Sequence, residues 1–251
     1  MGVVDLVAGV LVAVGEVAGK IQMKHPMKSF TVKILAARFI THDVKRFVTE
    51  KPEGFTFKAG QNVMLALHIP GRESDFRPFT FTSLPDWPYL EFIIKIYDDH
   101  NGVTKELGKT NAGGEFILRD VFGTITYKGP GVFLAGGAGI TPFISIFRAL
   151  YLKGGIHKSK LILSNKSSED IILPYELYGM LGKRFINVFT RQGVIGYRDR
   201  RIDRKMLIML IADFSGNFYV CGSREFVDNI MGYLVSLGAN AHSLIFEERN
   251  A

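Results

Sequence analysis

Hydrophobic and polar residues alternate over short stretches in the first half of the chain. Alternation is clear in residues 30–35, 62–69 and 90–97, and Gly, Pro and Asp residues separate these stretches. A strand that buries one face and exposes the other has this period of two. Many short strands joined by turns are typical of a barrel or sandwich. We therefore expect residues 28–128 to form an antiparallel β-barrel.

The rhythm changes after Gly129 and Pro130. From there, uninterrupted apolar runs alternate with stretches of helical periodicity. Strands of a parallel sheet that is covered by helices on both faces have this pattern. The sequence therefore predicts a second domain of α/β type with a parallel sheet over residues 129–251. Its strands are expected at 131–135, 159–164, 185–190, 217–221 and 243–247.

Residues 1–27 differ from both domains. Val, Ala, Leu and Gly dominate from Val3 to Ala18, but Asp5 and Glu16 interrupt the run. A membrane-spanning helix needs about 20 apolar residues with few charges. A signal peptide would begin with a positively charged region, which is missing here. We expect an N-terminal extension or an accessory helix without firm membrane insertion.

Cysteine and histidine usage limits the chemistry of the chain. Cys221 is the single cysteine, which excludes an internal disulfide and an iron–sulfur cluster held by cysteines. Such usage fits a reducing cytosol, so a cytoplasmic location is expected. The six histidines are scattered and show no metal-ligand spacing, so no metal site is predicted.

The chain is basic, with a net charge of +7 and a pI near 9.4. Basic residues gather at 153–160 and 198–205. Nucleic-acid binding fits poorly, because acids interleave with the second group and no aromatic stacking motif accompanies it. Two interpretations stay open: a solvated basic face, or a docking surface for an acidic protein.

A glycine-rich turn links the first strand and helix of the second domain. An apolar strand runs into Gly136, Gly137 and Gly139, and Pro142 stands where a helix would begin. Small residues let a pyrophosphate approach the backbone, and free N–H groups at a helix start favour its charge. We expect nucleotide binding here, with a purely structural turn as the alternative.

This turn departs from the standard dinucleotide fingerprint. A fingerprint that began at Gly137 would need glycine at position 142, where proline stands. The next strand ends in Ser164, Asn165 and Lys166 instead of the acid that usually holds an adenosine ribose. No acid at the end of this strand therefore repels a 2′-phosphate, which Lys166 can attract, so the sequence favours NADPH over NADH. The alternative stays open, because residues 165–170 are also similar to those of NADH-using proteins.

Four segments together resemble the ferredoxin–NADP reductase superfamily, which includes cytochrome b5 reductase. They are Arg77-Pro78-Phe79-Thr80, residues 102–107, Asn165-Lys166 with the residues up to 173, and Tyr219-Val220-Cys221-Gly222. A fifth segment, the glycine-rich turn with Thr141-Pro142, is similar to the nicotinamide-nucleotide motif of the family. The resemblance covers residues 30–247, keeps the family order, and is strongest to compact bacterial flavodoxin or ferredoxin reductases. It implies FAD in the barrel and NAD(P)H on the α/β domain.

The resemblance also implies roles for particular residues. Thr80 and Cys221 are expected near the reacting atoms, where NAD(P)H passes hydride to N5 of the flavin. The expected FAD and nucleotide contacts are Arg77, Pro78, Phe79, Thr80, Lys95, Tyr97, Gly102, Val103, Thr104, Gly136, Gly137, Ala138, Gly139, Ile140, Thr141, Pro142, Asn165 and Lys166.

The side chains suit these roles, and each has a plainer alternative. Arg77 can pair bidentately with a flavin phosphate, or form a surface ion pair. Phe79 can lie against the isoalloxazine, or pack in the barrel. Thr104 can bind pyrophosphate, or cap a helix. Lys95 and Tyr97 share a strand face near the cofactor; a solvated lysine and a core tyrosine are the alternatives. Cys221 can instead serve packing alone.

Two features depart from the family pattern. Ser223 replaces the usual proline after Cys-Gly, and residues 245–249 lack the frequent terminal aromatic. Glu247 is similar to an acidic residue near the nicotinamide in the family.

The implied function is an FAD-dependent NAD(P)H oxidoreductase that passes electrons to a separate carrier. Family members with a fused ferredoxin module need several cysteines, so this chain needs an outside acceptor, expected to be a small acidic flavodoxin or ferredoxin. A free-flavin or ferric reductase is the first alternative. An electron-transfer subunit of a larger dehydrogenase is the second, although the C-terminal cysteine cluster of such subunits is missing. A nucleic-acid binder is the weakest.

Overall fold

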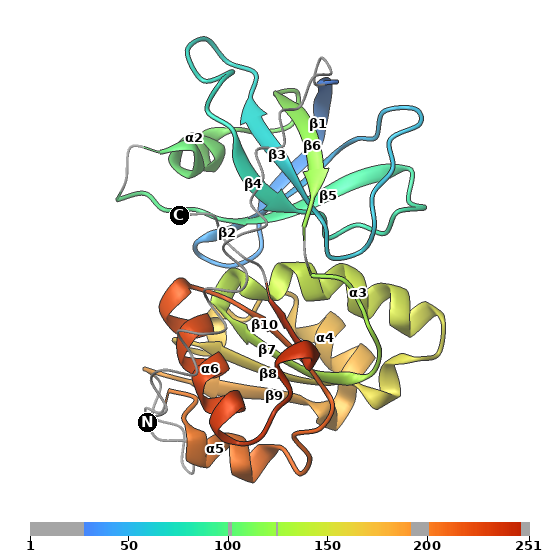
Figure 1. The fold of residues 1–251 in the computed structure, drawn as a ribbon. Helices are drawn as coiled ribbons and strands as arrows, with labels where there is room; N and C mark the ends of the chain where they lie inside the picture. Colours follow the sequence, from blue (N-terminus) through green and yellow to red (C-terminus); the bar gives the residue numbers. More distant parts are fainter. Residues whose placement is uncertain (1–27, 100–101, 124, 192–200, 247–251) are drawn as a thin grey trace, which may run out of the picture.

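The computed structural model describes residues 28–99, 102–123, 125–191 and 201–246. The predicted N-terminal extension and Glu247 lie outside these ranges, as do residues 198–200 of the basic stretch at 198–205. The described residues form a β-barrel followed by an α/β domain (Figure 1). Both predicted fold classes are confirmed. The predicted boundary at residue 129 lies between the last barrel strand and the first strand of the parallel sheet.

The first domain is a nearly closed antiparallel barrel of six strands in the order β4-β3-β6-β1-β2-β5. A bridge between Phe81 and Phe92 joins β5 to the chain just beyond β4 and so brings the two edges together. Helix α2 (Val103–Lys109) connects β5 to β6. The strands are β1 (Phe30–Phe39), β2 (Val44–Glu50), β3 (Asn62–Leu67), β4 (Arg77–Thr80), β5 (Tyr89–Lys95) and β6 (Glu115–Phe122).

Phenylalanine side chains fill the barrel. The rings of Phe57 and Phe81 stack with centroids 4.1 Å apart, and Phe47 meets Phe116 edge to face at 5.4 Å. Aromatic rings suit this interior because each buries a large area, and such pairs add about 0.5–1.5 kcal/mol beyond that burial. The alternation seen in the sequence therefore reflects an aromatic core inside the barrel.

The second domain is a parallel sheet of five strands in the order β11-β10-β7-β8-β9. Its strands are β7 (Gly131–Gly136), β8 (Lys160–Asn165), β9 (Phe185–Phe189), β10 (Asn217–Cys221) and β11 (Leu244–Phe246). Its α-helices are α3 (Thr141–Leu152), α4 (Pro174–Leu181), α5 (Arg204–Leu210) and α6 (Arg224–Ser236). Short 3-10 turns are η1 (Gly137–Ile140), η2 (Ile156–Lys158), η3 (Ser168–Asp170), η4 (Gly182–Arg184) and η5 (Ala241–Ser243).

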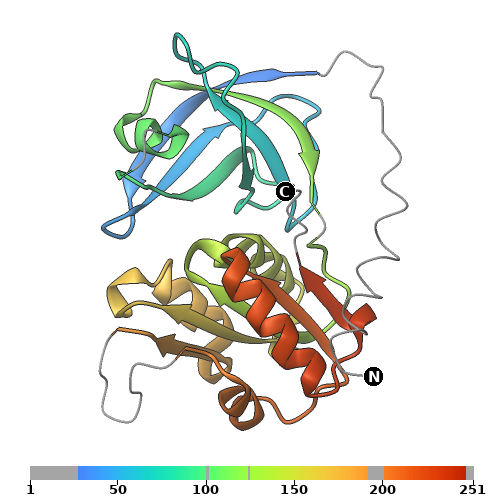
Figure 2. The ribbon, with the colours of Figure 1, turned by 60° about the vertical axis from the view of Figure 1, so that its left-hand side comes forward.

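Helices cover both faces of this sheet. On β7, Phe133 and Ala135 pack with α3 and α4, whereas Leu134 packs with α5 and α6. Successive side chains of a strand point to opposite faces, so a strand buried on both sides is apolar throughout. Figure 2 shows α6, in red, along one face of the sheet. This arrangement explains the uninterrupted apolar runs of the sequence.

Helix α3 lies between the parallel sheet and the barrel (Figure 1). The Gly60 N–H of the barrel donates to Ser145 Oγ of α3 at 3.0 Å. Val44 and Ile93 of the barrel belong to the same apolar cluster as the inner face of α3. The two domains therefore share a packed interface, and α3 is its centre.

A partly buried ion network also crosses this interface. Arg46, Glu91, Arg148 and Glu176 make up this interdomain ion network, in which Glu91 and Arg148 are buried. Arg148 of α3 donates to Glu91 of β5 at 2.6 Å and to Glu176 of α4 at 2.5 Å, and Arg46 donates to Glu91 at 2.7 Å. Burial acts to raise the pKa of Glu91, but the charges and hydrogen bonds of Arg148, then Arg46 and Thr82, hold that pKa below its usual value. Glu91 therefore stays charged at the interface.

None of the helices within the described ranges combines the length and the apolar character that crossing a membrane requires.

Candidate functional site

The candidate site lies where the strand order of the parallel sheet reverses. Strand β7 has its sequence successor β8 on one side and β10 on the other. Connections from β7 and β10 leave in opposite directions there, and ligands of open α/β sheets bind outside the carboxyl ends of such strands. These ends are Gly136 on β7 and Cys221 on β10. The predicted glycine-rich turn and the predicted Cys-Gly pair therefore lie side by side.

Gly139 packs directly on the backbone of the Cys-Gly pair. A Cβ at Gly139 would lie 2.3 Å from the Cys221 carbonyl oxygen and 2.7 Å from Gly222 Cα. No other residue fits at this distance without a backbone shift. Cys221 itself is buried and pairs in register with Ala135 of β7. The turn and the end of β10 therefore form one closely packed unit.

Phe226, a residue without a role in the sequence prediction, supports this unit from α6. A Cβ at Gly136 would lie 3.0 Å from the Phe226 ring, and one at Gly222 would lie 2.7 Å from it. Ser223, which stands in place of the family proline, is the N-cap of α6 and accepts from the Phe226 N–H at 3.3 Å. A serine followed by an aromatic three residues later is too common a pattern to indicate this role.

The glycine-rich turn opens a helix, as predicted. Gly137 has φ +53°, in the left-handed region that favours glycine, and begins η1. Helix α3 begins at Thr141, whose hydroxyl donates to the Ala138 carbonyl at 3.0 Å, and Pro142 follows in its first turn. Proline is suited to that position because the first N–H groups of a helix lack intrahelical partners. The remaining N–H groups there favour an anion such as a phosphate.

Asn165 and Lys166 lie at the carboxyl end of β8, next to the turn. Gly136 pairs in register with Ser164, the residue before Asn165. The Asn165 side chain is 6% exposed, and its buried Nδ2 has no hydrogen-bond partner among the described residues. A buried donor without a partner costs about 1–3 kcal/mol, and a ligand acceptor would remove that cost. Lys166 is exposed beside it.

The predicted flavin segment Arg77-Pro78-Phe79-Thr80 forms strand β4. Arg77 and Pro78 are exposed at its start, and the Arg77 guanidinium donates to the Phe76 carbonyl at 2.8 Å. Phe79 is half-buried against the barrel core. Thr80 donates through its hydroxyl to Asn62 Oδ1 of β3 at 2.7 Å. This hydrogen bond adds Asn62 to the residues of the candidate site. The sequence did not predict it, because nothing there connects Asn62 with Thr80.

The predicted pyrophosphate loop opens helix α2. Gly102 is the N-cap and no side chain caps this helix, so the alternative of Thr104 as a plain N-cap is wrong. Val103 is buried, whereas Thr104 is half-buried. The Thr104 hydroxyl is thus not committed to capping.

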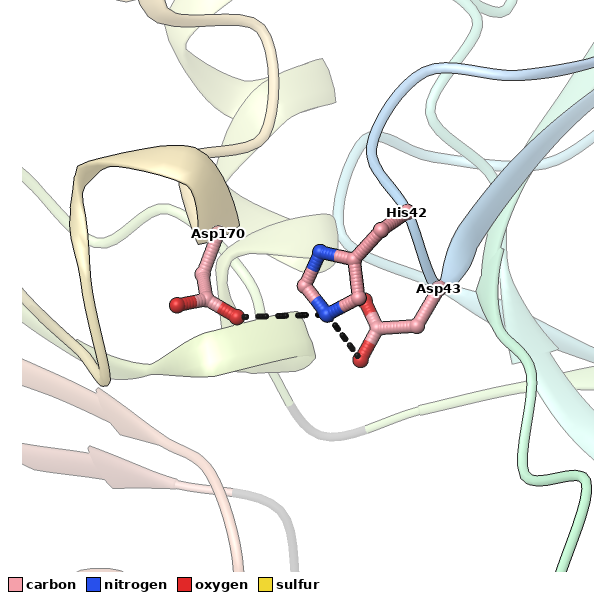
Figure 3. A group of neighbouring side chains, drawn as sticks. All are labelled: His42, Asp43 and Asp170. Carbon is pink, nitrogen blue, oxygen red and sulfur yellow. Dashed lines mark ion pairs between the residues drawn. The ribbon is translucent and has the colours of Figure 1, made fainter.

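Lys95 contacts a charged cluster between the two domains, whose other members, His42, Asp43 and Asp170, are drawn in Figure 3. Its Nζ lies 2.7 Å from Asp43 Oδ2, so the alternative of a merely solvated lysine is wrong. His42 Nε2 lies 3.5 Å from Asp43 and 3.9 Å from Asp170, at the end of η3 in the α/β domain. Burial acts to raise the pKa of Asp43, but Lys95 first, with His42 and Thr41, holds it below its usual value. Strand β5 ends at Lys95, and Tyr97 lies beyond it, 47% exposed rather than in the core.

His42, Asp43 and Asp170 also meet the distance requirement for a metal site, since one ligand atom from each lies within 4.8 Å of the others. Both carboxylates already have partners in the protein. Asp43 pairs with Lys95, and Asp170 accepts from Ser167 N–H at 2.7 Å and from its hydroxyl at 2.8 Å. We interpret the cluster as an ion-pair network between the domains. The sequence did not indicate it, because its histidine lies far along the chain from Asp170.

Known proteins resemble this chain over most of its length. The oxidoreductase NAD-binding domain model matches residues 133–231, which include the glycine-rich turn and Cys221. The reductase component of propane 2-monooxygenase from Mycolicibacterium goodii is 25% identical over 83% of this chain. NADH-cytochrome b5 reductase 3 from Rattus norvegicus is 26% identical over 62% of it. The chain spans 64% and 63% of the lengths of these two curated relatives.

The fold is shared with solved structures. A ferredoxin NADP+ reductase from Neisseria gonorrhoeae, solved with bound FAD and NADP, has a TM-score of 0.76. The match covers 88% of this chain and 98% of that one, at 23% identity. The order of the two domains and the position of the switch point are therefore properties of a known architecture.

Proposed function

We propose that this chain belongs to the ferredoxin–NADP reductase superfamily and is an FAD-dependent NAD(P)H oxidoreductase. One observation carries the proposal. The Gly139 backbone packs on Cys221 and Gly222, so the glycine-rich turn and the residue expected beside the nicotinamide form one unit. That unit stands at the switch point, where α/β sheets bind dinucleotides.

The residues present fit FAD. Arg77 offers an exposed guanidinium for a phosphate, and Phe79 offers an aromatic face beside it. Gly102 and Thr104 open α2 without a capping side chain, which leaves their polar groups for a pyrophosphate. Bound FAD supplies an acceptor for hydride and a donor of electrons. The protein supplies binding, orientation and electrostatics.

NAD(P)H takes the α/β side of the site in this proposal. The N–H groups of Gly137, Ala138, Gly139 and Ile140, with Thr141, face its pyrophosphate, and Asn165 Nδ2 donates to an acceptor of its adenosine half. Cys221 packs beside the nicotinamide, and Thr80 presents its hydroxyl to N5 of the flavin. Catalysis is mostly positioning, because holding reacting atoms about 3–3.5 Å apart removes much of the entropic barrier.

The electrons leave to a separate protein. The relatives named above are the reductase component of a monooxygenase and a reductase of cytochrome b5. This chain has one cysteine and a net charge of +7. We propose a small acidic carrier, such as a flavodoxin or ferredoxin, as the acceptor, and NADPH as the preferred donor. The cysteine usage supports a cytoplasmic location as part of the same proposal.

The first test is the absorption spectrum of the purified protein. We expect a yellow protein with an oxidised flavin spectrum that bleaches when NADPH or NADH is added without oxygen. If the nucleotide reduces the flavin but the flavin separates from the protein on a desalting column, the result would instead support a free-flavin reductase. A colourless chain that binds neither FAD nor nucleotide would overturn the proposal.

A further inference from the structure

We propose that Asn62 is a positioning residue that sets which hydrogen-bonding role the Thr80 hydroxyl plays toward the flavin. The inference rests on the proposed function, because it assigns a role to Asn62 within the same FAD site. The inference also fixes the direction of the effect on the flavin redox equilibrium. Asn62 makes the Thr80 hydroxyl a hydrogen-bond acceptor, which favours reduced flavin over oxidised flavin.

The contact between the two residues is short and partly buried. Asn62 of β3 pairs in register with Thr80 of β4, and the Thr80 hydroxyl donates to Asn62 Oδ1 at 2.7 Å. Asn62 is 4% exposed. At that burial water does not compete well for the amide oxygen, so the hydrogen bond is strong for a neutral pair.

The surrounding strands hold the Asn62 amide in place. Asn62 pairs with Thr80 on one side and with Phe122 of β6 on the other, so its backbone lies in the interior of the sheet. Gly123 follows with φ +135°, and a Cβ there would lie 3.4 Å from Asn62 Nδ2. The chain thus packs against the nitrogen end of the amide, while the oxygen end faces Thr80.

The donor and acceptor inventory then decides the role of Thr80. A hydroxyl has one hydrogen and two lone pairs, whereas an amide oxygen accepts only. Because the Thr80 hydrogen is directed to Asn62 Oδ1, only lone pairs remain for the flavin. Flavin N5 is an acceptor when oxidised and carries N–H after two-electron reduction. Thr80 therefore accepts a hydrogen bond from the N5–H of reduced flavin. In the oxidised flavin, N5 would face a second acceptor, and leaving two acceptors without a donor costs desolvation free energy.

Without the amide oxygen, the hydroxyl is free to rotate and donate to oxidised N5. Asn62→Leu removes the acceptor with little change in size. We expect the equilibrium between oxidised and reduced FAD to shift about tenfold toward the oxidised form, which is about 30 mV more negative for a two-electron couple. Asn62→Val is the second variant, because a β-branched side chain suits a strand if leucine does not pack.

A double-mutant cycle on the midpoint potential of bound FAD tests whether Asn62 acts through Thr80. The potential is measured in the wild type, Asn62→Leu, Thr80→Val and Thr80→Ser, and in Asn62→Leu combined with each of the two Thr80 substitutions. Thr80→Ser is the conservative control. We expect Asn62→Leu to lower the potential when residue 80 is threonine or serine, and to leave it unchanged when residue 80 is valine. Thr80→Ser alone should keep the wild-type potential.

Two results would overturn the inference. The first is a midpoint potential that neither Asn62→Leu nor Asn62→Val changes. The second is a shift by Asn62→Leu that is equally large with threonine and with valine at position 80. The latter would mean that Asn62 acts on the barrel and not through the hydroxyl. Failure of the proposed function is a different observation, namely a wild-type protein without flavin or with flavin that NAD(P)H does not reduce.

Discussion

Arg77 is the side chain on which flavin retention depends most in this proposal. It is exposed at the start of β4 and donates to the carbonyl of the residue before it. That leaves other N–H groups of the guanidinium for a phosphate, and its fork matches two phosphate oxygens at once. A neutral or shorter side chain at this position cannot reproduce that geometry.

We expect Arg77→Ala to lose FAD during purification. Hydrogen bonds to a charged group contribute about 1.5–3 kcal/mol each, so losing two weakens binding by two orders of magnitude or more. The measurement is flavin absorbance per protein after gel filtration. Arg72→Ala is the matched control, because Arg72 pairs with Asp75 on the neighbouring loop. Full occupancy in Arg77→Ala would remove Arg77 from the site.

Lys166 bears on the choice between NADPH and NADH. It is exposed directly after β8, beside the buried Asn165, and residues 164–166 include no acid that would repel a 2′-phosphate. We expect the wild type to prefer NADPH, and Lys166→Ala to lower kcat/KM for NADPH about tenfold relative to NADH. Lys183→Ala is the control, an exposed lysine of η4. A ratio of kcat/KM values that stays the same in Lys166→Ala would show that another residue discriminates.

At the scale of elements, the glycine-rich turn and β10 depend on each other. We expect Gly139→Ala to abolish nucleotide binding, because its Cβ would lie 2.3 Å from the Cys221 carbonyl and force the turn off β10. The control is Gly232→Ala in α6, where nothing lies within 4 Å of an added Cβ. Alanine there should stabilise the helix by about 0.5–1 kcal/mol.

Isothermal titration with NADP+ measures the binding, and thermal unfolding measures the fold of both variants. If Gly139→Ala binds nucleotide as the wild type does, the turn is not the pyrophosphate site. A lower melting temperature for Gly232→Ala than for the wild type would contradict the open space around that glycine.

At the scale of the whole molecule, the interdomain ion network orients the barrel on the α/β domain. We expect Arg148→Met to destabilise the protein by about 3–5 kcal/mol, because it leaves Glu91 charged and buried without its main partner. Denaturant unfolding measures the loss. Arg224→Ala, which breaks an exposed pair with Asp228 on α6, should cost less than about 0.5 kcal/mol.

The same network predicts a dependence on pH. The folded pKa of Glu91 is lowered, so its contribution is complete above its usual pKa of 4.5 and is lost as pH falls through the folded value. The difference in stability between wild type and Arg148→Met should therefore shrink in acid. If the difference in unfolding free energy between the wild type and Arg148→Met stays constant as the pH falls below 4.5, Arg148 stabilises the protein by packing alone.

The net charge of the molecule bears on its electron acceptor. Complementary charge mainly raises the rate of association, and salt screens it: the Debye length falls from about 10 Å at 0.1 M to about 3 Å at 1 M. We expect reoxidation by an acidic carrier to slow across that range, while reduction at saturating NAD(P)H changes much less. Stopped-flow absorbance measures both steps. Reoxidation that is independent of salt would instead indicate a neutral acceptor, such as free flavin or a quinone.

The sequence by itself determined the five strands of the parallel sheet, three strands of the barrel, the fold class of both domains and the turn that opens α3. These depend on local rules: a period of two for half-buried strands, apolar runs for strands buried on both faces, and glycine where the backbone needs φ +53°. Each rule acts over a few neighbouring residues, so the structure that it produces can be predicted from the sequence alone. The order of motifs added the resemblance to a family, and with it the expected roles of Arg77, Thr80 and Cys221.

Only the tertiary structure decided which distant residues meet. Four contacts join ordinary residue types from separate elements. They are Asn62 with Thr80, His42 with Asp170, Arg148 with Glu91, and Phe226 with Gly136. Nothing in their local sequence marks them, because a long-range contact depends on strand register and on how α3 packs between the domains. The closeness of Gly139 to Cys221 has the same origin, since the strand order of the sheet alone makes β7 and β10 neighbours.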